Sequence, residues 1–273
     1  MKNRTFEQHV LTRNEAAVVC SVLVTRLGGS YSRLLGIRLA RMESDETFKW
    51  FAAALLIGSP VPAAAAFAAY RELEARDVLT PQSLFHCGEG ALITVMAGAN
   101  VGRYSRRVAV VLHSACGSLI TDYDSDINRL HFFAEDNDDL IERLRRLGTG
   151  MPRRTVGLFL REMKGVWDKA RPRLSPSAFE AALRLGLTAA GKAERMSEAL
   201  DDVWEEAGGA GRTYADFEVA LVRLGEHYCS ARKCICCPMK KLCVARFTED
   251  SEHNEEAMSM SARRSEAWCD RTW

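Results

Sequence analysis

Five of the nine cysteines fall between residues 229 and 243, where their spacing predicts a metal centre. Cys229, Cys234, Cys237 and Cys243 follow the pattern Cys-x4-Cys-x2-Cys-x5-Cys. Four thiolates this close along the chain can surround one centre, and soft sulfur ligands suit zinc or an iron–sulfur cluster. His227 together with the last three of these cysteines forms an alternative zinc set. The spacing alone leaves both sets open.

The cysteine segment also resembles a known protein family. Residues 225–243 are similar to the C-terminal [4Fe–4S] loop of the endonuclease III superfamily, the helix–hairpin–helix DNA glycosylases. That family's loop reads Cys-x6-Cys-x2-Cys-x5-Cys with a proline after the third cysteine; here the last two intervals and Cys237-Pro238 are kept, and the first interval is two residues shorter. Cys236 would restore the longer interval but adjoins Cys237, so we rank it as the spare thiol. The resemblance therefore implies a [4Fe–4S] cluster on Cys229, Cys234, Cys237 and Cys243.

The resemblance covers roughly residues 45–245 and includes a phosphate-gripping hairpin. The family's Leu-Pro-Gly-Val-Gly-Arg-Lys-Thr-Ala matches residues 148–156, Gly-Thr-Gly-Met-Pro-Arg-Arg-Thr-Val, without a gap, and Pro152 replaces the second hairpin glycine. Glycines allow unusual φ values, and the first N–H groups of the second helix can face a phosphate. Such a hairpin grips the DNA backbone without reading bases. The implied contacts to double-stranded DNA come from Gly148, Gly150, Arg153, Arg154 and Thr155.

Arg154 decides the expected reaction type. Bifunctional members of the family carry a lysine here that attacks C1′ of the sugar, and a guanidinium that stays protonated cannot form that Schiff base. The family also has a carboxylate near the start of the helix after the hairpin unit, which stabilises positive charge on the sugar and orients a water. Asp168, fourteen residues beyond Arg154, is the expected acid if a helix begins after Gly165. In a second register, residues 175–187 match the acid-containing helix, and Ser175 occupies the acid position.

Two further segments match positions that handle a flipped base. Residues 55–59, Leu-Leu-Ile-Gly-Ser, resemble the family's Leu-Leu-Ser-Ala-Gln, whose glutamine fills the space left by the extruded base. Residues 102–106, Gly-Arg-Tyr-Ser-Arg, resemble Gly-Leu-Tyr-Asn-Ser, whose leucine wedges into the base stack. Ser59, Arg103 and Tyr104 are therefore expected to contact DNA, although Ser59 is too short to fill the gap alone. The lesion recognised does not follow from these residues.

These motifs require a helical scaffold. Apolar residues recur at three- and four-residue spacing almost throughout, which predicts an all-α fold of roughly ten helices. The long apolar run 50–70 is interrupted at 58–62, so it predicts two buried helices rather than a membrane span. The β-branched run 108–112 has no partner strand and is expected to be a buried helix. We expect a barrel domain at 46–163 with the hairpin, a cluster domain from 1–45 plus 164–246, a DNA-binding cleft between them, and an acidic mobile tail at 247–273.

Charge is balanced overall but uneven along the chain. Lys and Arg total 37 against 36 Asp and Glu, yet residues 140–173 hold ten basic and three acidic side chains. Residues 229–246 add five basic residues and no acid, and Arg103, Arg106 and Arg107 form a third group. Three such groups predict a basic surface for a polyanion. The polar N-terminal segment does not resemble a secretion signal, so we expect a cytoplasmic protein, nucleoid-associated if prokaryotic. We also expect a monomer with no membrane contact.

The leading functional prediction is a monofunctional base-excision DNA glycosylase that hydrolyses the N-glycosidic bond of a flipped damaged or mismatched base. The alternative is a catalytically silent iron–sulfur DNA-binding or damage-sensing protein that has lost the acid. A third hypothesis is a zinc-stabilised helical module with a protein partner.

Overall fold

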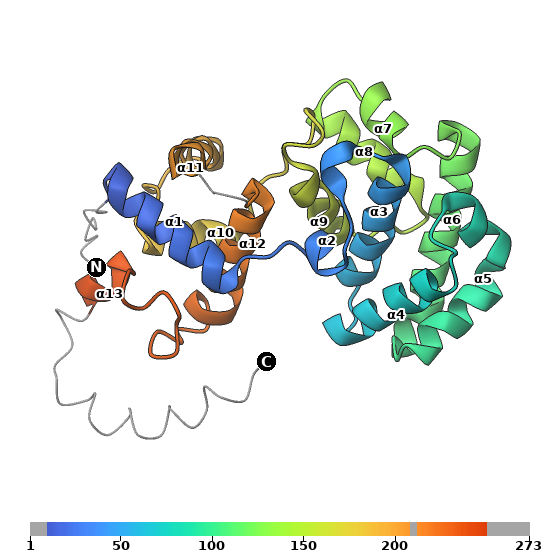
Figure 1. Ribbon diagram of the computed structural model, residues 1–273, viewed down its shortest axis with the longest axis horizontal. Coiled ribbons are helices and arrows are strands. Elements are labelled where there is room, and N and C mark those ends of the chain that lie inside the picture. Colours follow the sequence, from blue (N-terminus) through green and yellow to red (C-terminus); the bar gives the residue numbers. More distant parts are fainter. Residues whose placement is uncertain (1–9, 208–211, 250–273) are drawn as a thin grey trace, which may run out of the picture. The chain divides into compact units, whose positions relative to one another are not determined.

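The computed structural model describes residues 10–207 and 212–249, which are helical and contain no strand (Figure 1). The predicted all-α class is therefore confirmed. Short single turns lie at η1 (Leu39–Arg41) and η2 (Gly102–Tyr104), and a π-helical segment, η3, spans Gly225–Cys229. The α-helices are α1 (Arg13–Leu27), α2 (Tyr31–Leu34), α3 (Ser44–Gly58), α4 (Ala63–Ala75), α5 (Pro81–Gly98), α6 (Ser105–Tyr123), α7 (Asn128–Phe133), α8 (Asn137–Leu147), α9 (Arg153–Met163), α10 (Pro176–Arg184), α11 (Ala193–Ala207), α12 (Tyr214–Leu224) and α13 (Val244–Glu249).

The chain divides into two units, one from Tyr31 to Pro172 and one that joins the segment up to Ser30 with the chain from Arg173 onward. These boundaries differ from the expected ones at 45/46 and 163/164. Buried Glu162 accepts hydrogen bonds from the backbone N–H groups of Tyr31 (2.7 Å) and Ser32 (2.9 Å), which ties the segment after Ser30 to α9. Trp167 is buried with its ring 5.3 Å from that of Phe159, so the residues after α9 also belong to the 31–172 unit.

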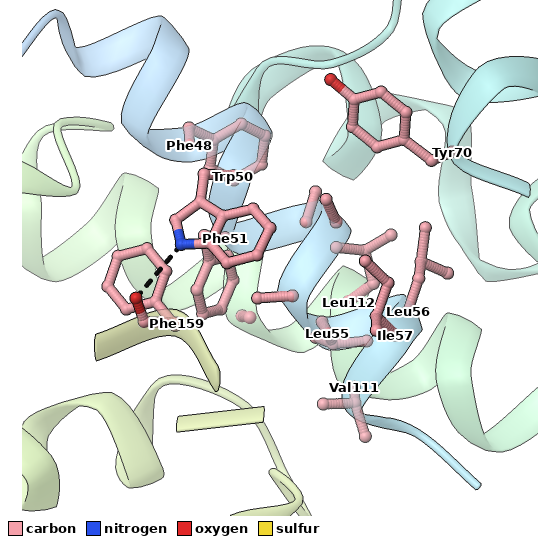
Figure 2. Close-up of a cluster of buried hydrophobic side chains, with 14 of the residues drawn as sticks. Phe48, Trp50, Phe51, Leu55, Leu56, Ile57, Tyr70, Val111, Leu112 and Phe159 are labelled. Atoms are coloured by element: carbon pink, nitrogen blue, oxygen red, sulfur yellow. Dashed lines mark hydrogen bonds between the residues drawn. The ribbon is translucent and has the colours of Figure 1, made fainter. Parts of the chain in front are cut away.

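Helix α3 is the central element of the 31–172 unit. Almost every residue from Thr47 to Gly58 is buried, so this helix is apolar on all sides and must be enclosed by other helices. The indole N–H of Trp50 donates to the carbonyl of Phe159 at 3.1 Å, as Figure 2 shows. Phe51 and Phe159 pack edge to face with ring centroids 5.8 Å apart. The interior of this unit thus fixes α9, the second helix of the hairpin motif, against α3.

The second unit has its own core. Apolar residues of α1 pack with those of α11 and α12, which explains why the N-terminal helix joins the C-terminal part of the chain. The rings of Trp204 and Phe217 stack at 5.0 Å between α11 and α12. Cys229, Cys237 and Met239 belong to the same core, so the cysteine segment is anchored to it.

Several local predictions are confirmed. The apolar run 50–70 forms the buried parts of α3 and α4, and the run 108–112 lies inside α6. No helix in the described part of the chain combines the length and apolarity needed to cross a membrane. The predicted acidic tail, 247–273, lies outside the described residues except for 247–249, which end α13.

Candidate functional site

The hairpin between α8 and α9 has the expected order of helix, tight turn and helix. Helix α8 ends at Leu147, Gly148 adopts an extended conformation, and Gly150 has φ +79°, in the region that favours glycine. The N–H of Met151 donates to the carbonyl of Gly148 at 3.1 Å and closes the turn. A Cβ on Gly148 would lie 2.8 Å from the carbonyl oxygen of Val111, whereas one on Gly150 would meet nothing within 4 Å. Gly148 is thus required for packing on α6, and Gly150 for its backbone conformation.

The start of α9 presents two cations to solvent. Arg153 and Arg154 are exposed and are the first two residues of the helix, and Pro152 precedes them as its N-cap. The first N–H groups of a helix have no partner within it and carry a partial positive charge. An exposed glycine turn, free N–H groups and two guanidinium groups together form a site suited to a phosphate.

Thr155 and Ser59, which the sequence predicts to contact DNA, lie beside the hairpin, and their side chains do not face solvent. Thr155 is fully buried. A Cβ on Gly58 would lie 2.6 Å from Thr155 Oγ1 and 2.7 Å from its Cα, so the end of α3 touches the start of α9. Ser59 is 4% exposed, and its hydroxyl donates to the carbonyl of Leu55 at 2.7 Å. Both side chains therefore position the hairpin.

Arg103 and Tyr104 lie on the same unit, in η2, directly before α6. Arg103 Nη2 donates to the Tyr104 hydroxyl at 2.9 Å, and the guanidinium lies 4.9 Å from the ring centroid. The hairpin meets α6 further along, where the Ser114 hydroxyl accepts from the N–H of Thr149 at 3.0 Å. At about 1.5 Å per residue, this contact lies roughly 15 Å along the α6 axis from Arg103. Arg103 is exposed and can contact a neighbouring part of a long polyanion.

Asp168 is not brought together with the hairpin. Its carboxylate accepts a hydrogen bond from Nε2 of His131 on α7, and this bond holds the pKa of Asp168 below its usual value. Helix α3 spans the unit, since its Ser44 end is bonded to Asp126, just before α7, and its Gly58 end touches Thr155. Its fifteen residues cover about 20 Å, so Asp168 lies at the end of the unit away from the hairpin.

The expected helix after Gly165 does not form. Residues 164–175 are turns and extended chain, and the next helix, α10, begins at Pro176. Ser175 is its N-cap, and its hydroxyl accepts from the N–H of Ala178 at 3.2 Å. The structure thus gives Ser175 the place at a helix start that the second sequence register assigned to it.

The four predicted cysteine ligands line one pocket. Arg184, Tyr228, Lys240 and Arg246 complete its described lining. Cys229 and Cys237 are buried, and Cys234 and Cys243 are half-buried. Burial raises the pKa of the Cys229 thiol to about 12 and also raises those of Cys237 and Cys243. A raised pKa favours the neutral thiol, whereas a metal ligand must be a thiolate. A metal centre bound here would itself deprotonate these thiols. His227 is exposed and is not part of this lining, which disfavours the alternative zinc set.

Within the described residues, no three His, Cys, Asp or Glu side chains are arranged to hold one metal ion. A single zinc ion needs every sulfur at about 2.3 Å from one point. A four-iron cluster binds each thiolate through a different iron, so its ligands stand further apart. The structure shows the four cysteines around one pocket, and the [4Fe–4S] cluster stays a prediction.

Sequence reasoning did not identify the cations around this pocket. Lys240 Nζ donates to the carbonyl of Ile235 at 3.1 Å, and the Cys243 thiol donates to the carbonyl of Arg184 at 3.4 Å. The sequence shows an excess of basic residues in 229–246, but it does not show that some of them line the pocket of the cysteines. Arg184 lies some fifty residues earlier on α10 and carried no signal.

Comparison with known proteins finds matches in fold but none in sequence. No protein-family model matches the chain, and no curated protein matches it in sequence. Among solved structures, a trapped endonuclease III–DNA covalent intermediate matches with a TM-score of 0.52 and 15% identity, over 88% of this chain and 99% of the other. A non-covalent endonuclease III–DNA complex gives the same score and identity over 89% and 100%. A thermostable thymine-DNA glycosylase matches at a TM-score of 0.46 and 15% identity, over 86% of this chain and 98% of the other.

The order of helices, the hairpin after α8 and the cysteine segment after α12 therefore occur within an overall match to endonuclease III structures. At 15% identity this likeness establishes the fold alone. The chain has the all-α fold of the endonuclease III structures.

Proposed function

We propose that the protein binds the backbone of double-stranded DNA through the hairpin at 148–152 and the start of α9. The observation that supports this most is the exposed Gly150 turn at φ +79°, followed directly by exposed Arg153 and Arg154 at a helix N-terminus. Such a site recognises phosphates and not base edges, so binding should tolerate changes of DNA sequence. The solved structures of the same fold include two endonuclease III–DNA complexes, which supports the same ligand.

We further propose that DNA binding here serves recognition of damage without the family's usual catalytic acid. Ser175 caps the helix after the hairpin unit, where the second register of the resemblance places a carboxylate, and a serine hydroxyl stays neutral at physiological pH. A neutral hydroxyl bonded to a backbone N–H offers no negative charge to stabilise an oxocarbenium-like sugar. Asp168 remains ionised but lies at the α7 end of the 31–172 unit.

A monofunctional DNA glycosylase is the second candidate, and the fold itself favours it. In that case base release would be hydrolysis without strand cleavage. Arg154 cannot supply a neutral amine. The Lys169 amine donates to the carbonyls of His131 at 3.0 Å and Ala134 at 2.6 Å, which keeps it in a structural role on α7. An added borohydride should therefore trap no covalent adduct.

The cysteine pocket supports a cofactor proposal. Cys229, Cys234, Cys237 and Cys243 would hold a [4Fe–4S] cluster, which would supply cross-links between the segments that carry its ligands. Because Cys229 and Cys237 belong to the core of their unit, loss of those cross-links should loosen the C-terminal segment.

Fluorescence anisotropy with lesion-free duplexes of two unrelated sequences tests DNA binding. Arg153→Ala and Gly150→Val should weaken binding to both duplexes, and Arg153→Ala should reduce the salt slope by about one. Arg76→Ala is the matched control, because it removes one exposed cation that is paired with Glu72 on α4. Equal affinities for all four proteins would overturn the hairpin assignment.

A panel of uracil, oxidised, alkylated and mismatched duplexes separates the two candidates. Tighter binding to one lesion without base release supports the damage-sensing function. Release of a base, detected as alkali-sensitive sites, supports the glycosylase and rejects the silent protein.

A further inference from the structure

The end of the 31–172 unit that carries α7 is strongly acidic. Residues 122–139 contain seven acidic side chains, and Arg129 is their single Lys or Arg. The acidic residues are Asp122, Asp124, Asp126, Glu135, Asp136, Asp138 and Asp139. Most of them are exposed, so this end presents a negative surface although the whole chain is nearly neutral.

An apolar pocket lies within this acidic end. Phe132, Phe133 and Met42 line it and are 76%, 46% and 39% exposed. The pocket has a volume of about 550 Å³. Large exposed hydrophobic side chains that gather around one hollow, inside a charged rim, are typical of a protein interaction site.

The polar groups at one side of the pocket already have partners within the unit. Asp126 Oδ1 accepts from the hydroxyl of Ser44 at 2.6 Å and from the N–H of Asn128 at 2.9 Å. The Asn128 amide donates to the carbonyl of Met42 at 2.8 Å and accepts from the indole of Trp167 at 3.1 Å. These groups shape the pocket and have little hydrogen-bonding capacity left for a small polar ligand.

The two remaining polar lining residues are also paired. Arg129 forms an ion pair with Asp124, and His131 is bonded to Asp168. The surface that is left for an incoming group is therefore apolar. The chain on either side of α7 is mostly acidic, and Asp124, Asp126 and Asp139 of it are paired within the unit. This combination favours an apolar anchor side chain flanked by basic residues.

Helix α7 is held firmly, so the exposure of its phenylalanines does not come from a loose segment. Lys169 Nζ donates to the carbonyls of His131 (3.0 Å) and Ala134 (2.6 Å) at the end of the helix. The imidazole of His131 stacks on the buried indole of Trp167, with ring centroids 5.1 Å apart. A preformed surface loses less entropy when a partner binds.

We propose that the α7 end of the 31–172 unit is a docking surface for a partner protein segment that is basic and carries an apolar anchor side chain. DNA and anionic membranes are disfavoured because the acidic rim repels phosphate. The hairpin lies about 20 Å away, at the other end of α3. DNA and the partner can therefore bind this unit at the same time.

Fluorescence anisotropy with three labelled synthetic helical peptides tests the proposal on the full-length protein. The first peptide has leucine and lysine at helical spacing, the second replaces its lysines with glutamate, and the third replaces its leucines with serine. Only the leucine–lysine peptide should bind, more weakly as salt is raised. Phe132→Ser and Phe133→Ser should each weaken it by roughly tenfold or more, as expected for buried aromatic anchors.

Leu34→Ser is the matched control, since Leu34 is an exposed apolar residue of the same unit outside the pocket lining. It should leave peptide binding unchanged, and neither phenylalanine variant should alter affinity for duplex DNA. Equal weakening by Leu34→Ser, or equal binding of the lysine–serine peptide, would overturn the docking site. Weaker DNA binding by Phe132→Ser would assign the patch to the DNA surface instead. Self-association that disappears in Phe132→Ser would make a second copy the occupant and reject the basic partner.

Discussion

Replacing Gly58 with alanine should destabilise the protein by disturbing the contact that positions the hairpin. Gly58 is the last residue of α3, and an added Cβ would lie 2.6 Å from Thr155 Oγ1, 2.7 Å from its Cα and 2.8 Å from its backbone nitrogen. Non-bonded heavy atoms pack at about 3.5–4.0 Å, so the start of α9 must move away from α3. Thr155 directly follows Arg153 and Arg154, which must move with it.

The expected free-energy change follows from two opposing effects. Overpacking by one methyl group costs about 1–3 kcal/mol. Exchange of a helical glycine for alanine recovers about 0.5–1 kcal/mol because the unfolded chain loses freedom. The free energy of unfolding should therefore fall by about 1–2 kcal/mol, and affinity for duplex DNA should fall with it.

Urea titration of Gly58→Ala and of Gly157→Ala measures this effect. Gly157 lies on the exposed side of α9, where an added Cβ meets nothing within 4 Å, so its alanine variant should gain stability. Two of the three close contacts at Gly58 are to backbone atoms, so Thr155→Ala should not rescue Gly58→Ala. A Gly58→Ala protein as stable as the wild type, or full rescue by Thr155→Ala, would refute the close approach of α3 and α9.

Three further outcomes are expected. Cys234→Ser should lose iron and visible absorbance and lower the stability of the cysteine segment, whereas Cys236→Ser should retain both; the opposite result would exchange the two ligands. Burial raises the pKa of Glu162 above its ordinary 4.5, so the folded state holds that proton more tightly. The stabilisation is complete below pH 4.5 and is lost as pH rises through the folded pKa; Glu162→Gln should remove this slope in urea titrations and cost about 1–3 kcal/mol, because one backbone N–H loses its acceptor. Asp168→Asn should leave DNA affinity and any base release unchanged, and loss of base release would restore Asp168 as the acid.

The helical class and the cysteine pocket could be predicted because their signals are local. Periodic apolar residues define α3 and α6 wherever they pack, and short intervals between cysteines limit how far apart the thiols can lie. The cations Arg184 and Lys240 show the limit of this reasoning for the same site. Their place beside the thiols depends on how α10 meets the cysteine segment, which no short sequence pattern encodes.

The side chains beside the hairpin illustrate a second limit. A hydroxyl residue next to a phosphate-binding turn suggests a hydrogen-bond donor to the phosphate. Here Thr155 packs against Gly58 instead, and the Ser59 hydroxyl donates to the carbonyl of Leu55. A glycine at the end of α3 is the sequence feature that permits this close approach. Its partner, about a hundred residues away, is identified only by the fold.

Asp168 was expected at a helix start because the chain after Gly165 was taken to be helical. Gly165 instead has φ +84° and lies in a turn, and the chain returns toward α7. There His131 bonds to Asp168 and stacks on Trp167. Because of this turn, Asp168 lies away from the hairpin, and the Lys169 amine reaches the end of α7, where it donates to the carbonyl of Ala134. The segment that carries a catalytic acid in the first sequence register is therefore used to build a rigid acidic surface. Under the proposed function, Ser175 occupies the acid position and two exposed phenylalanines stand at the α7 end of the unit, so the protein would hold DNA for a partner rather than act on it alone.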